Sequence, residues 1–94
     1  MPLKELRARI EKLDTQILSL IEQRMALAKE VLEAKKAEGK AINDVEQNTV
    51  VLNRVANAAT ERGLDGEAVK RIFEILIKMN IERQHELSGE GNLP

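Results

Sequence analysis

The sequence contains no cysteine, tryptophan or tyrosine, and it has a single phenylalanine, Phe73, and a single histidine, His85. Without cysteine there is no disulfide, no thiolate zinc site and no cysteine nucleophile. A single histidine gives no histidine-rich metal site and little support for a Ser/His/Asp triad. The scarcity of aromatic side chains argues against nucleic-acid recognition by base stacking. These absences point away from metal-, thiol- and triad-based catalysis.

The sequence also lacks an excess of charge of either sign and any long apolar run. The formal net charge is −1, with both signs mixed along the chain, so no basic phosphate-binding surface or acidic tail is visible. No apolar run approaches the roughly 18 residues of a membrane span, and the N-terminus lacks the apolar core of a signal peptide. No glycine-rich phosphate loop occurs. We predict a cytoplasmic protein with no membrane or nucleic-acid partner, no cofactor and no metal.

The stretch from Leu3 to about Glu38 dominates what is present. Its apolar residues recur three and four positions apart, the spacing of a helical seam that faces another helix. A helix of roughly 36 residues is about 54 Å long, and the rest of a 94-residue chain cannot cover such a seam. We therefore predict that a second copy of the chain covers it. The seam residues are Leu3, Leu6, Ile10, Leu13, Ile17, Leu20, Leu27, Val31 and Ala34.

Two further helices are expected, and Gly39 is a plausible end for the first. The second runs from about Val45 to Glu61, and both Asn43 and Asp44 are possible N-caps, because each begins a capping-box pattern. Gly63 ends this helix. Its apolar stripe is Val45, Leu52, Val55 and Ala59.

The third helix runs from about Gly66 to Leu87, with Asp65 as its N-cap. Its broad apolar face predicts packing against the other helices. The fold prediction is all-α: three helices, the first very long, in one domain over residues 1–87, with a flexible tail over residues 88–94. The apolar face consists of Val69, Ile72, Phe73, Leu76, Ile77 and Ile81.

Five polar residues occupy apolar-face positions: Arg24, Lys35, Asn48, Asn80 and Gln84. Burying such groups costs free energy unless partners satisfy them. One interpretation is structural: Arg24 pairs with an internal carboxylate and sets helix register, Asn80 and Gln84 hydrogen-bond at a helix crossing, and Lys35 extends to solvent. The other interpretation is a polar pocket inside a helical bundle, because all three helices contribute. Its cations and amides favour a small anion, a carboxylate bound by the arginine fork.

The same residues carry a resemblance to a known family. Arg7 near the start of a long helix, the run Arg24-Met25-Ala26-Leu27-Ala28 and Lys35 resemble the all-helical, type II class of chorismate mutases. The connector Ile42-Asn43-Asp44 and the third-helix run from Ile72 through Gln84 are also similar to that class. Each motif is short, but their joint spacing is specific, and the resemblance covers roughly Leu3 to Leu87.

The resemblance implies an intertwined homodimer with two active sites. Each site would be built mostly by one chain, with Arg7 supplied by the long helix of the partner subunit. Arg24 would bind the second carboxylate of the substrate, while Lys35 and Gln84 would hydrogen-bond the ether oxygen of the breaking bond.

Further roles follow from the same resemblance. Asp44 and Asn48 would bind the substrate hydroxyl, and Asn80 would line the site near a carboxylate. One departure is clear: many relatives carry an Arg-Glu pair where this chain has Gln47-Asn48, so a cation and a negative charge are replaced by amides. The apolar walls would be Val31, Ile77 and Ile81.

The implied activity is isomerisation of chorismate to prephenate, a step toward phenylalanine and tyrosine. An isochorismate pyruvate-lyase on the same scaffold is an alternative, and a non-catalytic helical dimerisation module is another. A domain of a larger enzyme is a third possibility, although Pro2 and the short tail favour a free-standing chain.

Overall fold

A computed structural model describes residues 1–89 and shows four helical segments in the order α1 (Leu3–Ala26), α2 (Ala28–Glu38), α3 (Val45–Glu61) and α4 (Gly66–Ser88). Within residues 1–89 there is no strand, so the all-α prediction is confirmed. No helix in this range is both long and apolar enough to cross a membrane. Most of the predicted tail, residues 90–94, lies outside the described residues, and Ser88 belongs to α4 rather than to a tail.

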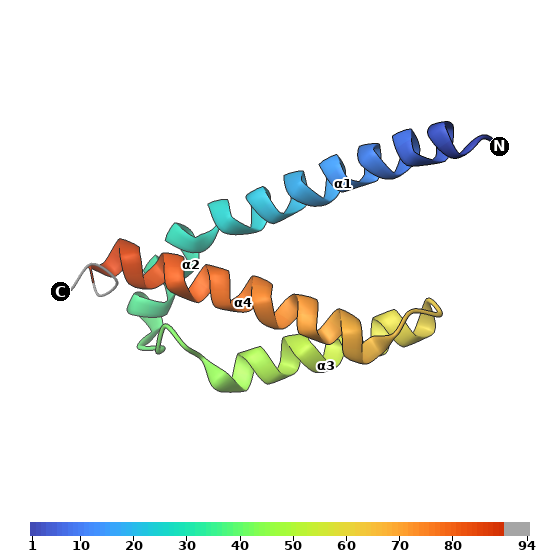
Figure 1. Ribbon diagram of the computed structural model, residues 1–94. Helices are drawn as coiled ribbons and strands as arrows, with labels where there is room; N and C mark the ends of the chain where they lie inside the picture. Colours follow the sequence, from blue (N-terminus) through green and yellow to red (C-terminus); the bar gives the residue numbers. More distant parts are fainter. Residues whose placement is uncertain (90–94) are drawn as a thin grey trace.

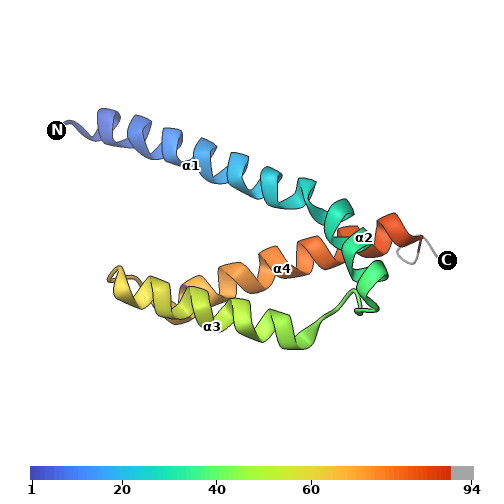
Figure 2. The ribbon, with the colours of Figure 1, turned by 180° about the vertical axis from the view of Figure 1, so that it is seen from behind.

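The first predicted helix has the expected ends but is divided at Leu27. The Leu27 N–H bonds to the Arg24 carbonyl, three residues back, at 3.3 Å, and the chain bends between α1 and α2 (Figures 1 and 2). The side-chain amide of Asn80 donates to the same carbonyl at 3.1 Å. A side chain that enters the hydrogen-bond ladder of a helix is a recognised cause of a kink. The three-helix prediction holds, because Leu27 keeps a right-handed helical conformation (φ −79°, ψ −10°) and α1 and α2 together form the first predicted helix; the sequence did not predict the division at Leu27.

The other boundaries follow from local capping. The side chain of Asp44 accepts a hydrogen bond from the backbone N–H of Gln47, which selects Asp44 over Asn43 as the N-cap of α3. Asp65 caps α4 as predicted, accepting from the backbone N–H groups of Glu67 and Ala68. Gly39 adopts a left-handed conformation (φ 69°) at the end of α2, which a residue with a Cβ rarely adopts.

Helix α4 is the centre of the chain. It packs against α3, which lies beside it in both ribbon views, and against α2 and α1 (Figures 1 and 2). In contrast, the backbone of α3 does not approach that of α1 or α2 closely. The small core consists of apolar residues of α2 and α3 together with one polar residue of α4, Gln84. The buried apolar residues are Ala28, Leu32, Val55 and Ala59.

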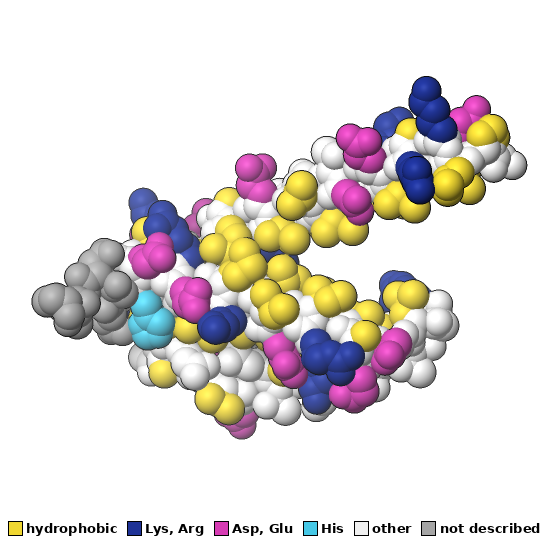
Figure 3. Space-filling model, viewed as in Figure 1, with side chains coloured by type: hydrophobic (Ala, Val, Ile, Leu, Met, Phe, Trp, Pro, Cys, Tyr) yellow, Lys and Arg dark blue, Asp and Glu magenta, His cyan; other side chains and the backbone are white. Residues whose placement is uncertain are grey.

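Most of α1 extends away from the other helices, and none of its residues is buried in the single chain. Figure 3 shows hydrophobic side chains on the side of this arm that faces α4, with open space between them. The radius of gyration is 16.6 Å. A compact domain of this length has a radius of gyration of about 12 Å. A single chain therefore leaves the predicted seam uncovered.

Two other apolar predictions differ in the single chain. Val45 was assigned to the packing stripe of α3, and Ile72 to that of α4, but both side chains are exposed. Val45 is the first residue of its helix, where the stripe has no neighbouring helix to meet. Ile72 belongs to an exposed apolar row on α4 that also contains Ile75 and Met79.

Candidate active site

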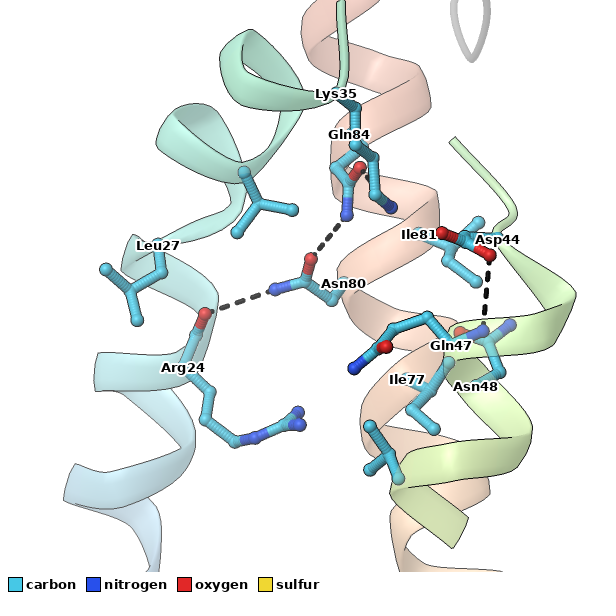
Figure 4. Close-up of a pocket in the computed structure, with 12 residues that line it drawn as sticks. Arg24, Leu27, Lys35, Asp44, Gln47, Asn48, Ile77, Asn80, Ile81 and Gln84 are labelled. Atoms are coloured by element: carbon cyan, nitrogen blue, oxygen red, sulfur yellow. Dashed lines mark hydrogen bonds between the residues drawn. The ribbon is translucent and has the colours of Figure 1, made fainter. Parts of the chain in front are cut away.

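A cavity of about 280 Å³ lies between α1 and α2 on one side and α3 on the other, with α4 contributing to its wall (Figure 4). This volume is near the lower end of the range for small-molecule sites. Each of the four helical segments contributes lining residues, so the cavity exists only in the folded chain. The lining residues are Arg24, Leu27, Val31, Lys35, Asp44, Gln47, Asn48, Val51, Ile77, Asn80, Ile81 and Gln84.

The structure brings together every predicted site residue except Arg7. Arg7 lies in the exposed N-terminal part of α1 and does not line the cavity of its own chain. Sequence reasoning did not include Leu27, Gln47 or Val51 among the site residues. Helical spacing was the available signal, because Leu27 follows Arg24 by three residues and Val51 follows Asn48 by three.

The ammonium group of Lys35 is held by two acceptors. Its Nζ donates to the backbone carbonyl of Ile42 at 2.6 Å and to Oε1 of Gln84 at 3.0 Å. Burial lowers the pKa of Lys35 from its ordinary value of 10.5, and the negative charge of Asp44 opposes this lowering. The ammonium therefore faces the cavity wall rather than extending to solvent. Its hydrogen bond to Ile42 holds the connector between α2 and α3 against the cavity.

Two side-chain amides of α4 continue this contact down the wall (Figure 4). Nε2 of Gln84 donates to Oδ1 of Asn80 at 2.6 Å, and Nδ2 of Asn80 donates to the backbone carbonyl of Arg24 at 3.1 Å. Gln84 is only 2% exposed. The predicted hydrogen bonding at a helix crossing is thus present, and the same amides line the cavity, so the two interpretations of these residues are compatible.

The guanidinium of Arg24 is positioned by an aromatic ring. Its Cζ lies 5.7 Å from the centroid of Phe73, a cation–π distance, and Figure 4 shows the side chain reaching from α1 into the cavity. Within residues 1–89, no carboxylate forms an ion pair with Arg24. Arg24 therefore does not form the predicted ion pair with an internal carboxylate in the single chain. Its guanidinium faces the cavity instead.

Two acceptors face the cavity from the start of α3. One carboxylate oxygen of Asp44 caps the helix by accepting from the Gln47 N–H at 3.2 Å, which leaves its second oxygen. Nδ2 of Asn48 donates to Oδ1 of Asn43 at 2.9 Å, which leaves the Asn48 carbonyl oxygen. This corner of the cavity can therefore accept a hydrogen bond from a hydroxyl group.

The arrangement combines two cations, one carboxylate, amides and apolar walls. In the described residues there is no cluster of three or more histidine or acidic residues that fits a metal ion. All buried side-chain nitrogen and oxygen atoms of this part of the chain have hydrogen-bond partners, and Lys35, Gln84 and Asn80 on the cavity wall are held by the contacts described above. Fixed donors around an apolar cavity can stabilise developing negative charge.

The fold and this cavity define an all-helical protein with a small, net-positive site between its helices. A family model described as chorismate mutase type II matches residues 6–85. The chorismate mutase of Methanocaldococcus jannaschii is 38% identical over 88 residues, which cover 94% of this chain and 89% of that protein. The chain belongs to the chorismate mutase type II family.

Longer relatives show the same similarity in one part of their sequence. Bifunctional chorismate mutase/prephenate dehydratases of Enterobacter agglomerans and Escherichia coli are 33% and 30% identical over 86 residues, 92% of this chain. The chain spans 22% of the length of these bifunctional proteins.

Proposed function

We propose that this chain rearranges chorismate to prephenate in the cavity between its helices. Family membership and the similarity to the M. jannaschii protein support chorismate mutase activity, an isomerisation. The observation that carries the assignment of the site is the convergence of Arg24, Lys35 and Gln84 on one small cavity. The sequence predicted that Arg24 and Lys35 of the first helix would meet Gln84 of the last helix in one pocket.

The reaction is an intramolecular [3,3] rearrangement. The ether C–O bond breaks while a C–C bond forms, and no proton is transferred. The protein must hold the chair conformer in which the reacting ends meet, a positional effect. It must also stabilise negative charge that develops on the ether oxygen. Lys35 supplies a charged donor for this oxygen, and the Nε2 group of Gln84 supplies a neutral one that needs no protonation.

The substrate carries two carboxylates, and one chain provides too few free cations for both. Arg24 is the open guanidinium of the cavity, whereas Lys35 is engaged on the wall beside Gln84. Arg7 of the partner subunit would supply the second arginine. Its position on an extended arm, remote from its own cavity, fits a role in the site of another copy.

The proposed intertwined homodimer follows from the same arm. The seam of α1 and the row Ile72, Ile75 and Met79 on α4 are both exposed in the single chain. Their burial against a second copy would remove a large apolar area from water at roughly 25 cal/mol per Å². A dimer would therefore cover the uncovered helix and complete the site.

Asp44 and Asn48 would accept a hydrogen bond from the substrate hydroxyl, using the oxygens that capping and the Asn43 contact leave. Gln47 lines the same corner where many relatives have arginine. An amide there gives weaker binding of a carboxylate than a guanidinium, because charge-assisted hydrogen bonds are about twice as strong as neutral ones.

The test is incubation of the purified chain with chorismate near neutral pH, with product identification and with Arg24→Ala beside it. We expect prephenate, and a loss of at least ~3 kcal/mol of transition-state stabilisation in the variant, comparable to the loss of an oxyanion donor. Arg54→Ala is the matched control, since Arg54 is exposed on α3.

Each other outcome contradicts part of the assignment. Pyruvate and salicylate from isochorismate, without prephenate from chorismate, would indicate a lyase. A folded dimer that binds and converts neither compound would indicate a dimerisation module. Full activity in a folded Arg24→Ala protein would remove Arg24 from the site.

A further inference from the structure

Asn80 occupies the middle of a hydrogen-bonded chain that joins three helical segments. Lys35 of α2 donates to Gln84, Gln84 donates to Asn80, and Asn80 donates to the Arg24 carbonyl at the end of α1, over distances of 3.0, 2.6 and 3.1 Å. Figure 4 shows the two amides one above the other on α4, between the two cationic residues. Both polar ends of Asn80 are therefore engaged.

The two ends of this series of hydrogen bonds, Lys35 and the Arg24 carbonyl, determine the direction of every hydrogen bond in it. An ammonium group only donates and a backbone carbonyl only accepts. Lys35 must therefore face the oxygen of Gln84, and the Arg24 carbonyl must face the nitrogen of Asn80. The remaining pair then matches the nitrogen of Gln84 with the oxygen of Asn80. Each amide has one orientation that satisfies both of its neighbours.

This order bears on the group proposed to contact the ether oxygen. The amide of Gln84 is planar, so engaging one Nε2 hydrogen with Asn80 fixes the direction of the other. That second hydrogen is the donor that remains for a ligand in the cavity. Without Asn80, the side chain of Gln84 would keep only its contact with the ammonium group of Lys35. That group lies at the end of a flexible side chain and would hold the amide less firmly.

The hydrogen bond from Nδ2 of Asn80 lies next to the division between α1 and α2. Asn80 bonds the Arg24 carbonyl beside the break at Leu27, so it ties α4 to the residue whose guanidinium enters the cavity. The same side chain therefore locates the donor of Gln84 and the backbone of Arg24 relative to each other.

We propose that Asn80 is a positioning residue that acts through Gln84 and the Arg24 backbone, in addition to lining the cavity. This inference rests on the proposed function, because it concerns the geometry of that reaction. It differs from the role implied by the family resemblance, in which Asn80 lies near a substrate carboxylate. A residue that only binds a substrate carboxylate would affect mainly KM. A residue that orients the donor group of Gln84 would affect kcat.

The kinetic test uses the full-length chain with Asn80→Leu, which has nearly the same shape but no hydrogen bonds, and with Gln84→Ala and the double variant. We expect Asn80→Leu to lower kcat by at least ~10-fold with KM within about threefold, and to lower it by less than ~3-fold in the Gln84→Ala background. Asn57→Leu is the control, since Asn57 is exposed on α3. Equal losses in both backgrounds, or a change confined to KM, would overturn the proposal.

A second readout does not depend on turnover. In ¹H–¹⁵N spectra the side-chain NH₂ signal of Gln84, assigned by its loss in Gln84→Ala, should show two distinct, slowly exchanging protons. In Asn80→Leu these protons should move toward the shifts and exchange rates of exposed glutamines, while the backbone signals of α3 persist. An unchanged Gln84 signal would refute the positioning role even if the chain failed to convert chorismate. Absence of wild-type turnover would instead count against the proposed function.

Discussion

Lys35 shows how the site is organised at the scale of single residues. Its ammonium donates to the Ile42 carbonyl and to the Gln84 oxygen, both of which belong to the same chain. Donors that are already oriented need little reorganisation when charge develops in a reaction. Burial of this group has a cost, which appears as a lowered pKa for Lys35. The charge that the proposed reaction uses is therefore easier to lose than that of a solvent-exposed lysine.

This lowered pKa predicts a pH dependence of activity. The value of kcat/KM reports groups of the free enzyme, and it should fall as pH rises through the pKa of Lys35, at a pH below 10.5. Lys35→Arg stays charged in this range, so its lower activity should not show that alkaline decrease. Lys36→Arg, an exposed control on the same helix, should keep it. A wild-type profile that is flat up to pH 10.5 would contradict the prediction.

The contribution of Lys35 to stability changes with pH in the direction opposite to its contribution to activity. Because its pKa is lower in the folded chain, the unfolded chain binds more protons between that pKa and 10.5. The contribution of this group to the free energy of unfolding therefore rises with pH in that window. Circular dichroism over the same pH range, compared with Lys35→Met, would separate loss of activity from loss of fold.

At the scale of elements, the packing of α3 against α4 depends on a residue without a side chain. A Cβ on Gly66, the first residue of α4, would lie 2.8 Å from Oγ1 of Thr60 and 2.9 Å from the carbonyl oxygen of Ala56. The Thr60 hydroxyl donates to that carbonyl at 3.0 Å, so it would have to give up this hydrogen bond to move away, while the carbonyl is fixed by the backbone of α3. Close approach of the two helices therefore requires glycine here.

Gly66→Ala is expected to destabilise the chain although alanine favours helices by up to about 1 kcal/mol over glycine. Overpacking of this kind costs about 1–3 kcal/mol, and each 1 kcal/mol lowers Tm by roughly 4–8 °C in a domain of this size. Thermal unfolding at equal protomer concentration measures the effect, with Glu67→Ala as the control. Adding Thr60→Ala should restore only part of the loss, because the backbone contact remains. A Tm equal to or above that of the wild type would show that the helices separate without cost.

The division of the first helix at Leu27 is also an effect between elements. The local sequence Arg24-Met25-Ala26-Leu27-Ala28 consists of good helix formers and holds no glycine or proline. The Asn80 amide on the Arg24 carbonyl supplies the reason for the break. The bend directs α2 toward α4, which places Lys35 opposite Gln84.

At the scale of the whole molecule, the extended shape of one chain is the main argument for a dimer. A 24-residue helix with no buried residue is unusual, because helices in water depend on packing of their apolar face. The proposed dimer also predicts that each site takes Arg24 from one chain and Arg7 from the other.

Complementation between two inactive variants tests this sharing. A heterodimer of Arg7→Ala and Arg24→Ala has one site with both arginines and one site with neither. After subunit exchange at equal amounts, half of the dimers are mixed, so about a quarter of wild-type activity is expected. A mixture of Lys35→Ala and Arg24→Ala is the control, since every site in its heterodimers lacks one group. If exchange is verified by native mass spectrometry, no gain in the first mixture would place Arg7 outside the shared site.

Much of the fold was predictable because its signals are local. The cap at Asp65, the glycine after α2 and the full span of α3 follow from short-range hydrogen bonding and backbone sterics. Periodicity located the apolar faces, but it did not show that Val45 and Ile72 are exposed in one chain, because a face has no partner until the helices are placed.

The candidate site was also largely visible, for a related reason. Polar residues at apolar positions are costly unless satisfied, so Arg24, Lys35, Asn80 and Gln84 stood out against helical periodicity. Leu27 and Val51 did not, because an apolar residue on an apolar face has the same appearance whether it lines a cavity or fills a core.

The sequence alone thus determined the helices, their ends and the polar residues that interrupt their apolar faces, since each depends on neighbours within a turn or two. The tertiary structure alone decided which of these polar groups hydrogen-bond to one another. Lys35 and Gln84 are 49 residues apart, and Asn80 and Arg24 are 56 apart. Such contacts exist only when packing brings separate helices together, and the division of the first helix at Leu27 depends on one of them.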